Sequence, residues 1–227
     1  QARAQTASSD RHGHARLGRS NSRGASSHPR KMFTCIYFAE CKEYVKQLGW
    51  SLGLFNKKHN RCYCQSCYSN NLPNTLRVAD SDYVVPRGWA GFGLGVDPFR
   101  GDDLWNTWIV VYHGTTPLAA QSILTHRQFL LPGDRLLDGT KLAIRAGHIP
   151  GKNHIYTSPS IRYASLHVYS QVKSFTSPQT SKLYNAQIVL QCKQKPGTFQ
   201  TQGETVGWGD KHICNIVPND IIEHFSD

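Results

Sequence analysis

Long apolar segments are missing from this 227-residue sequence. It has no run of eighteen or more apolar residues, so we expect no transmembrane helix and no membrane partner. It also has no Gly-x-Ser-x-Gly elbow and no Gly-x-x-x-x-Gly-Lys-Ser/Thr loop, which argues against a serine hydrolase and a P-loop enzyme. Neither Cys192 nor Cys214 has an evident activating partner, so no thiol nucleophile is indicated.

The positive charge of the chain is concentrated at one end. The formal net charge is +11, and residues 1–31 contain seven Lys or Arg and one acid. This tail has no Ile, Val, Phe or Tyr, so it lacks the apolar surface that would offset the entropy cost of ordering. We expect a disordered arm that either binds nucleic acid or an acidic partner or serves only as a solvated linker. Because the first residue is Gln, we expect a fragment or a processed product.

Five of the seven cysteines lie between positions 35 and 67, and three of them form Cys62-x-Cys64-x-x-Cys67. Zinc requires four sulfur or nitrogen ligands, and a Cys-x-x-Cys turn supplies two thiolates to one ion. We expect Cys41 to complete the site, with Cys35 and His59 as alternatives, because a short helix is predicted over 41–49 and its first residue can fold back onto the turn. Disulfides and free thiols are the competing interpretations. A site with four protein ligands has no open position, so its role would be structural.

The central part of the sequence predicts a buried strand over 108–112, whose β-branched residues suit a sheet interior. Trp105 and Trp108 flank this strand and are expected to pack in the core rather than to line a cleft. Thr116 and Pro117 have the pattern of a helix N-cap and first helical residue. A second strand is predicted over 154–157, followed by a helix that begins after residues 158–160 and carries Tyr163 and Tyr169.

Two of these segments contain residues suited to a ribose and a flat ring. The first strand ends in His113-Gly114-Thr115, which offers a ring donor, a backbone amide and a hydroxyl at one strand edge. Tyr156 and Tyr163 are seven residues apart across the second strand and helix, so their rings can converge on a flat ligand. The loop after residue 133 contains four basic residues that either meet a pyrophosphate or are solvated.

The combination resembles the diphtheria-toxin-like, His-Tyr-Glu branch of the ADP-ribosyltransferases, and is most similar to the neuralized-like protein 4 type of these domains. The resemblance covers roughly residues 35 to 223. It rests on Cys-x-Cys-x-x-Cys, Pro-Arg-Gly-Trp at 86–89, Tyr-His-Gly-Thr at 112–115, Leu-Pro-Gly-Asp at 131–134 and Ile-Tyr-Thr-Ser-Pro-Ser-Ile-Arg-Tyr-Ala at 155–164.

The resemblance implies roles for individual residues. His113 would bond the ribose next to nicotinamide, and the Gly114 backbone would pair with the carboxamide. Tyr156 would occupy the tyrosine position of the triad, and Tyr163 would stack on the nicotinamide ring. The implied NAD⁺-binding set is His113, Gly114, Thr115, Tyr156, Ser160 and Tyr163.

A catalytic carboxylate is also needed, because it stabilises the cationic sugar as nicotinamide leaves. Glu223 best fits the family pattern of an acid that opens the last strand, and it completes the catalytic set with His113 and Tyr156. The alternatives are Asp220, which follows Asn219, and Glu204, which is expected in a loop over 199–208 that faces the acceptor.

Together these features predict an α+β protein with a split antiparallel sheet. The expected organisation is a basic tail (1–31), a cysteine-rich zinc module (32–80) and an ADP-ribosyltransferase domain (81–227). Its reaction would transfer ADP-ribose from NAD⁺ to a protein side chain or a nucleic-acid base and release nicotinamide. The alternative is an inactive domain that binds nucleic acid or protein. We expect a monomer located in the cytoplasm or nucleus.

Overall fold

The computed structural model describes residues 35–95, 104–143, 154–205 and 211–218, and the side chains of 202–218 are outside this description. The predicted tail, Asp220 and Glu223 lie outside the described residues. The helices are α2 (Ile36–Gln47), α3 (Leu104–Thr107), α4 (Pro117–His126) and α5 (Ile161–Ala164), with short 3₁₀ turns η1 (Leu52–Leu54) and η2 (Lys57–His59). None of the helices described has the length and apolar character needed to cross a bilayer.

The strands form small antiparallel sheets, which confirms the α+β prediction at that level. They are β1 (Arg61–Cys62), β2 (Thr75–Val78), β3 (Ser81–Val84), β4 (Ala90–Gly91), β5 (Ile109–Gly114), β6 (His154–Thr157), β7 (Lys173–Thr176), β8 (Leu183–Ala186), β9 (Val189–Gln194), β10 (Gln200–Thr205) and β11 (Lys211–Pro218). The pairs are β1–β4, β2–β3, β5–β9 and β7–β8, and a further sheet has the order β10–β11–β6. The predicted boundary at residue 80 falls in the turn of the β2–β3 hairpin.

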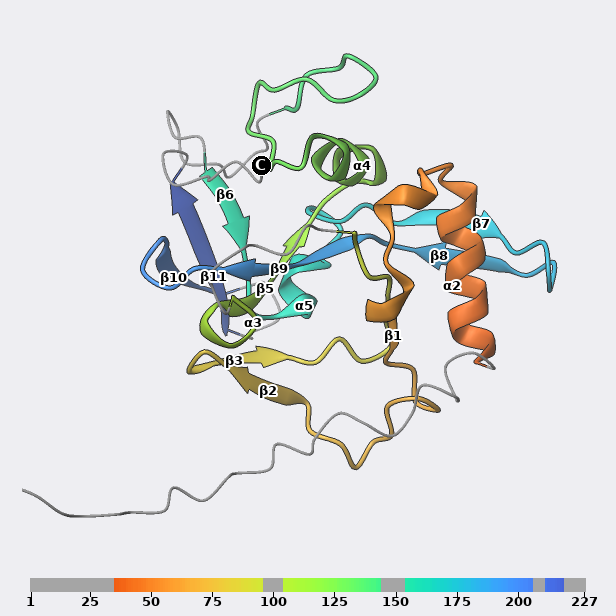
Figure 1. Ribbon diagram of the computed structural model, residues 1–227, viewed down its shortest axis with the longest axis horizontal. Coiled ribbons are helices and arrows are strands. Elements are labelled where there is room, and N and C mark those ends of the chain that lie inside the picture. The colour runs from red at the N-terminus through yellow and green to blue at the C-terminus, as the bar shows by residue number, and fades with distance from the viewer. Residues whose placement is uncertain (1–34, 96–103, 144–153, 206–210, 219–227) are drawn as a thin grey trace, which may run out of the picture.

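The centre of the fold is β5, which lies between β9 and the end of β6 (Figure 1). Its residues Ile109 to Tyr112 are all buried, and Val111 and Tyr112 are at most 1% exposed. Tyr112 exchanges two backbone hydrogen bonds with Ser158, with N to O distances of 2.7 and 2.9 Å. This bridge joins the β5–β9 pair to the β6–β11–β10 sheet.

Helix α4 begins as its sequence predicts. The Thr116 hydroxyl accepts a hydrogen bond from the Ala119 amide at 3.2 Å, and Pro117 is the first helical residue. The helix ends at His126, and its C-cap residue Arg127 has a left-handed φ of 53°. Ala120 and Ile123 face inward and pack with Leu190 of β9.

Helix α2 starts earlier than predicted. It runs from Ile36, with Cys35 at its N-cap, whereas the sequence placed its start at Cys41. Nothing between these positions breaks a helix, and the additional turn lets Phe38 stack on Phe92 at a ring-centroid distance of 5.0 Å. Tyr44, nearer the other end of the helix, contacts the ring of Phe175 at 5.0 Å and so packs α2 on the β7–β8 hairpin (Figure 1).

Three other predictions about local structure are wrong. Trp105 is not a core residue, because 59% of its surface is exposed. Glu204 lies on strand β10, paired with His212, and not in a loop, because the 200–205 segment finds a partner strand in β11. The helix after β6 ends at Ala164, so Tyr169 lies beyond it.

Gly114 ends β5 at a point where α5 passes very close. A Cβ atom at this position would lie 1.9 Å from the carbonyl oxygen of Ala164 and 2.8 Å from Cβ of Tyr169. Since backbone atoms would have to move, we expect Gly114→Ala to lower the free energy of unfolding by about 3 kcal/mol. Urea unfolding followed by circular dichroism measures this change.

The matched control is Gly53→Ala, where the nearest atom would be the Ser51 hydroxyl at an ordinary 3.6 Å. We expect a change below about 0.5 kcal/mol there. Equal stability of the two variants would show that α5 does not pack against β5 as described.

Candidate functional site

Four cysteines come together beside the start of α2. The sulfur atoms of Cys35, Cys62, Cys64 and Cys67 all lie within 4.8 Å of one another. Cys35 Sγ is 3.8 Å from Cys62 Sγ and 3.5 Å from Cys64 Sγ, and all four thiols are free. A tetrahedral ion with metal–sulfur bonds of about 2.3 Å separates its sulfur ligands by about 3.8 Å. The group could therefore hold a metal ion such as zinc.

The fourth cysteine of the cluster is Cys35, and not Cys41 as the sequence favoured. The earlier start of α2 explains the difference, because the cysteine at the beginning of the helix is Cys35. Cys41 lies in the next turns of the helix, where burial raises the pKa of its thiol to about 11. A cysteine at the start of the helix does join the cluster, but the helix starts six residues before Cys41 at its N-cap Cys35.

The turn that carries the last two cysteines is held by backbone hydrogen bonds. The amides of Cys67 and Tyr68 both donate to the carbonyl of Cys64, at 3.0 and 2.8 Å. Burial raises the pKa of the Cys64 thiol, but hydrogen bonds from the Cys67 backbone and from the thiols of Cys35 and Cys62 outweigh burial and lower it to about 7. A metal site requires such thiolate character.

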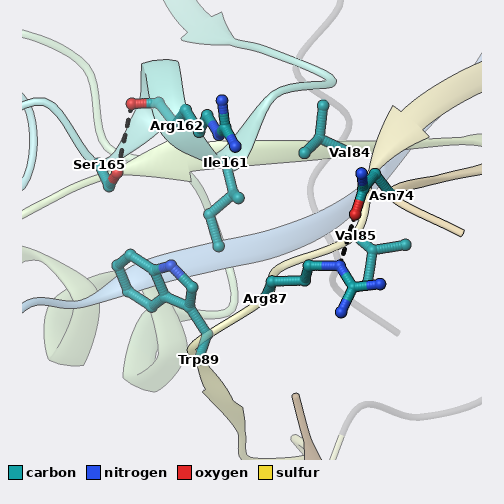
Figure 2. Close-up of a pocket in the computed structure, with 8 residues that line it drawn as sticks. All are labelled: Asn74, Val84, Val85, Arg87, Trp89, Ile161, Arg162 and Ser165. Atoms are coloured by element: carbon teal, nitrogen blue, oxygen red, sulfur yellow. Dashed lines mark hydrogen bonds between the residues drawn. The ribbon is translucent and has the colours of Figure 1, made fainter. Parts of the chain in front are cut away.

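Hydrogen bonds tie this cluster to the rest of the protein. The amide of Tyr63, between two of the cysteines, donates to the Trp89 carbonyl, and the Gly88 amide donates to the Tyr63 carbonyl, both at 2.9 Å. The chain from Arg87 to Trp89 also forms one wall of a cavity of about 100 Å³ (Figure 2). Its lining residues are Asn74, Val84, Val85, Arg87, Trp89, Ile161, Arg162 and Ser165.

That cavity is distinct from the predicted NAD⁺ residues, because its lining does not include His113, Tyr156 or Tyr163. A cavity of this volume holds a few water molecules and is too small for a dinucleotide. The guanidinium group of Arg87 binds Asn74 Oδ1 at 2.6 Å and stacks on the Tyr68 ring at 4.6 Å. Arg87 therefore braces the loop that follows the cysteines.

The predicted His-Gly-Thr and Ile-Tyr segments lie side by side, because the Tyr112–Ser158 bridge aligns them. His113 Nδ1 lies 2.9 Å from the carbonyl oxygen of Tyr156. A carbonyl oxygen can only accept, so Nδ1 carries the proton and donates this bond. In a neutral ring Nε2 is then the nitrogen that accepts hydrogen bonds.

The ring of His113 also has an edge-to-face contact with Phe129, at a centroid distance of 5.2 Å. Phe129 is not among the site residues that the sequence predicts. No local motif marks it, because it comes from the segment after α4 and reaches His113 only through tertiary packing.

The second predicted tyrosine lies close to the first but is buried. Tyr163 is 4% exposed and packs against Tyr156, Leu166 and Tyr169. Its hydroxyl lies 2.9 Å from the hydroxyl of Tyr169, and the two rings are 5.2 Å apart. A ligand ring can therefore reach Tyr163 only when one of these side chains moves.

The remaining predicted ligands are Thr115 and Ser160. Thr115 follows β5 and is buried, at 4% exposure. Ser160 is the N-cap residue of α5, and its amide donates to the Ser158 hydroxyl at 3.1 Å. The structure thus brings His113, Tyr156 and Tyr163 together, with Gly114 close to Tyr169, while Glu223 and Asp220 are outside the described residues.

No protein-family model matches this chain, and no solved structure matches it.

The cysteine cluster gives a direct test of which residues bind metal. We expect purified protein to contain about one zinc ion per chain, and we expect Cys35→Ser to lose it because a tetrahedral site needs all four ligands. The apo variant should also unfold at a lower temperature, since metal affinity contributes to folding. Inductively coupled plasma mass spectrometry and thermal unfolding measure the two effects.

Cys41→Ser is the matched control, because it changes a cysteine of the same helix outside the cluster. It should keep its metal content. Loss of metal in Cys41→Ser with retention in Cys35→Ser would reverse the assignment.

Proposed function

We propose that this chain is a mono-ADP-ribosyltransferase that uses NAD⁺. The observation that carries the proposal is the hydrogen bond between His113 Nδ1 and the Tyr156 carbonyl oxygen. It joins the two segments whose sequences resemble the nicotinamide-binding half of these enzymes. The two residues are 43 positions apart in the sequence.

His113 is suited to hold the ribose of NAD⁺. Its Nδ1–H is committed to the Tyr156 carbonyl, which fixes the tautomer and the ring orientation. Nε2 then accepts a hydrogen bond from a ribose hydroxyl. The Phe129 ring restricts the imidazole from one side, so the acceptor nitrogen is held in a defined direction.

The tyrosines would bind the nicotinamide ring. Tyr156 and Tyr163 pack together, and Tyr169 also packs against Tyr163. In the proposal, nicotinamide enters when Tyr169 or Tyr156 moves away from Tyr163. The nicotinamide ring then replaces the tyrosine ring that packed against Tyr163. Gly114 ends β5 beside this cluster, where its backbone can approach the carboxamide.

The reaction breaks the bond between the anomeric carbon of the ribose and the nicotinamide nitrogen. A nucleophile on the acceptor forms the new bond to that carbon, and nicotinamide leaves as a neutral molecule with the electron pair of the broken bond. The proton of the nucleophile passes to a carboxylate or to solvent. A carboxylate near the 2′-hydroxyl stabilises the positive charge that develops on the sugar. We assign this role to Glu223, with Asp220 and Glu204 as alternatives.

The register of β11 against β6 limits how Glu223 can reach His113. Tyr156 pairs with Ile216 of β11, and Glu223 is seven residues further along the chain. An extended chain covers about 3.3 Å per residue, or about 23 Å for seven residues. Glu223 can therefore act at His113 only if the chain turns back after Pro218.

We also propose that the metal in the cysteine cluster is a structural zinc ion. The donor set of four thiols favours zinc, and four protein ligands leave no position for a substrate. Zinc would hold the start of α2 to β1 and to the 63–68 turn. The chemistry of the proposed reaction does not involve it.

A second candidate function is a non-catalytic binding domain. The specific observation in its favour is the burial of Tyr163, whose hydroxyl bonds with Tyr169 where nicotinamide is expected to stack. In that case the His113–Tyr156 contact would serve only to connect two sheets.

Nicotinamide release and transfer of labelled ADP-ribose from NAD⁺ separate the two functions. Wild type is compared with Glu223→Gln in the presence of protein and nucleic-acid acceptors. We expect the transfer rate of the variant to fall about 100- to 1,000-fold, because removal of one group that stabilises a transition state has an effect of this size. Asp220→Asn and Glu204→Gln serve as matched controls that should retain activity.

Loss of ADP-ribose transfer in Glu223→Gln, with an intact fold, would identify Glu223 as the catalytic carboxylate. Activity that is lost in Glu204→Gln or Asp220→Asn instead would move the role to that residue. A folded wild type with no nicotinamide release would favour the binding domain.

A further inference from the structure

An exposed basic and aromatic surface lies next to the cysteine cluster and has no part in the proposed reaction. We define the η2 surface as Lys57, Lys58, His59, Arg61 and Trp105. The first four come from η2 and β1, and all five residues are exposed. Arg61 directly precedes Cys62 of the cluster, so the metal site would anchor one edge of this surface.

The aromatic part of the surface consists of two nearly parallel rings. The rings of His59 and Trp105 have centroids 6.3 Å apart and an interplanar angle of 18°. Trp105 leaves 59% of its surface in contact with solvent, so its indole ring is accessible to a ligand. An exposed indole ring next to a parallel imidazole ring offers a flat surface on which a planar group can stack.

Backbone contacts fix the segments that carry the two rings. Lys193 Nζ donates to the carbonyl oxygens of Trp105 and Trp108 at 2.9 and 3.0 Å, which fixes the end of α3. The Asn56 amide donates to the Gly93 carbonyl at 2.8 Å under η2. A Cβ atom on Gly93 would lie 2.5 Å from Cβ of His59, so η2 sits directly on this glycine.

The sequence segment that contains η2 carries charge of one sign. The sequence from Tyr44 to Ala79 contains five Lys or Arg and no Asp or Glu. Arg61 Nη1 donates to the carbonyl oxygens of Lys58 and Asn60, at 3.3 and 2.7 Å, and this folds its guanidinium group against η2. Asp102 and Asp103 precede α3 in the sequence and lie outside the described residues.

We propose that the η2 surface binds single-stranded nucleic acid. Bases would stack on Trp105 and His59, and Lys57, Lys58 and Arg61 would contact the phosphates that flank them. Unpaired bases offer flat faces at regular spacing together with negative charge, and this combination matches a rigid aromatic pair bordered by cations. An acidic peptide would satisfy the cations but would leave the two rings exposed.

This binding is independent of the proposed transferase activity, because none of the five residues lies at the His113–Tyr156 junction. Fluorescence anisotropy of labelled 20-nucleotide oligo(dT) and oligo(rU), titrated with the full chain at several salt concentrations, measures it. The two oligonucleotides distinguish DNA from RNA as the source of the strand.

Lys57→Ala/Lys58→Ala tests the phosphate contacts. Each contact with a single strand contributes about 0.7 to the slope of log affinity against log salt, so we expect the slope to become shallower by about 1.4. At 0.1 M salt this corresponds to a roughly 25-fold weaker affinity. The matched control is Lys173→Ala/Lys182→Ala, which removes the same charge from exposed positions on and next to the β7–β8 hairpin and should leave affinity nearly unchanged.

Trp105→Ala tests the stacking contact. We expect affinity to fall roughly five- to hundredfold with no change in salt slope, because stacking does not release counterions. Trp105→Phe should recover part of the loss, and it remains informative if Trp105→Ala fails to fold.

Three results would overturn the proposal. One is an equal loss in the two double-lysine variants, which would indicate unspecific attraction by net charge. Another is unchanged affinity in both Trp105 variants. The third is binding of a labelled polyglutamate peptide as tight as that of the oligonucleotides, which would make this surface a site for acidic polypeptides.

Discussion

Two hydrogen bonds between the backbones of Tyr112 and Ser158 hold the two parts of the sheet together. Both residues are at most 1% exposed, so an unmade bond there would cost about 1–3 kcal/mol for each buried group left without a partner. This bridge also sets the register that places His113 beside Tyr156. The Tyr112 hydroxyl donates to the Val84 carbonyl at 2.8 Å, so the same residue fixes the β2–β3 hairpin against the sheet.

The cysteine cluster is the second constraint, and it acts on segments that have little core of their own. β1 has two residues, and the loop from 63 to 74 is held mainly by turns and by Arg87. A metal ion would connect this loop to α2, and α2 packs in turn on the β7–β8 hairpin through Tyr44 and Phe175. The cysteine-rich segment therefore packs against the rest of the described protein.

Local signals in the sequence were sufficient for several elements. Thr116 and Pro117 marked the start of α4, and the His154–Thr157 strand has the bounds that its pattern predicted. Predictions failed where tertiary contacts decided the outcome. The extra first turn of α2 depends on Phe92, and the strand character of β10 depends on β11. Trp105 is exposed although tryptophan usually packs in cores, and its position follows from Lys193, 88 residues away in the sequence.

We propose that the His113–Tyr156 junction binds NAD⁺, and ¹⁵N NMR of the His113 ring is the most direct test of this binding. The protein is labelled at its histidines, and His113→Gln assigns the signals. The account predicts a protonated Nδ1 and an unprotonated Nε2, whose resonance moves saturably as NAD⁺ is added because a ribose hydroxyl donates to it. An unprotonated Nδ1, or ring signals that stay unchanged in millimolar NAD⁺, would contradict the account.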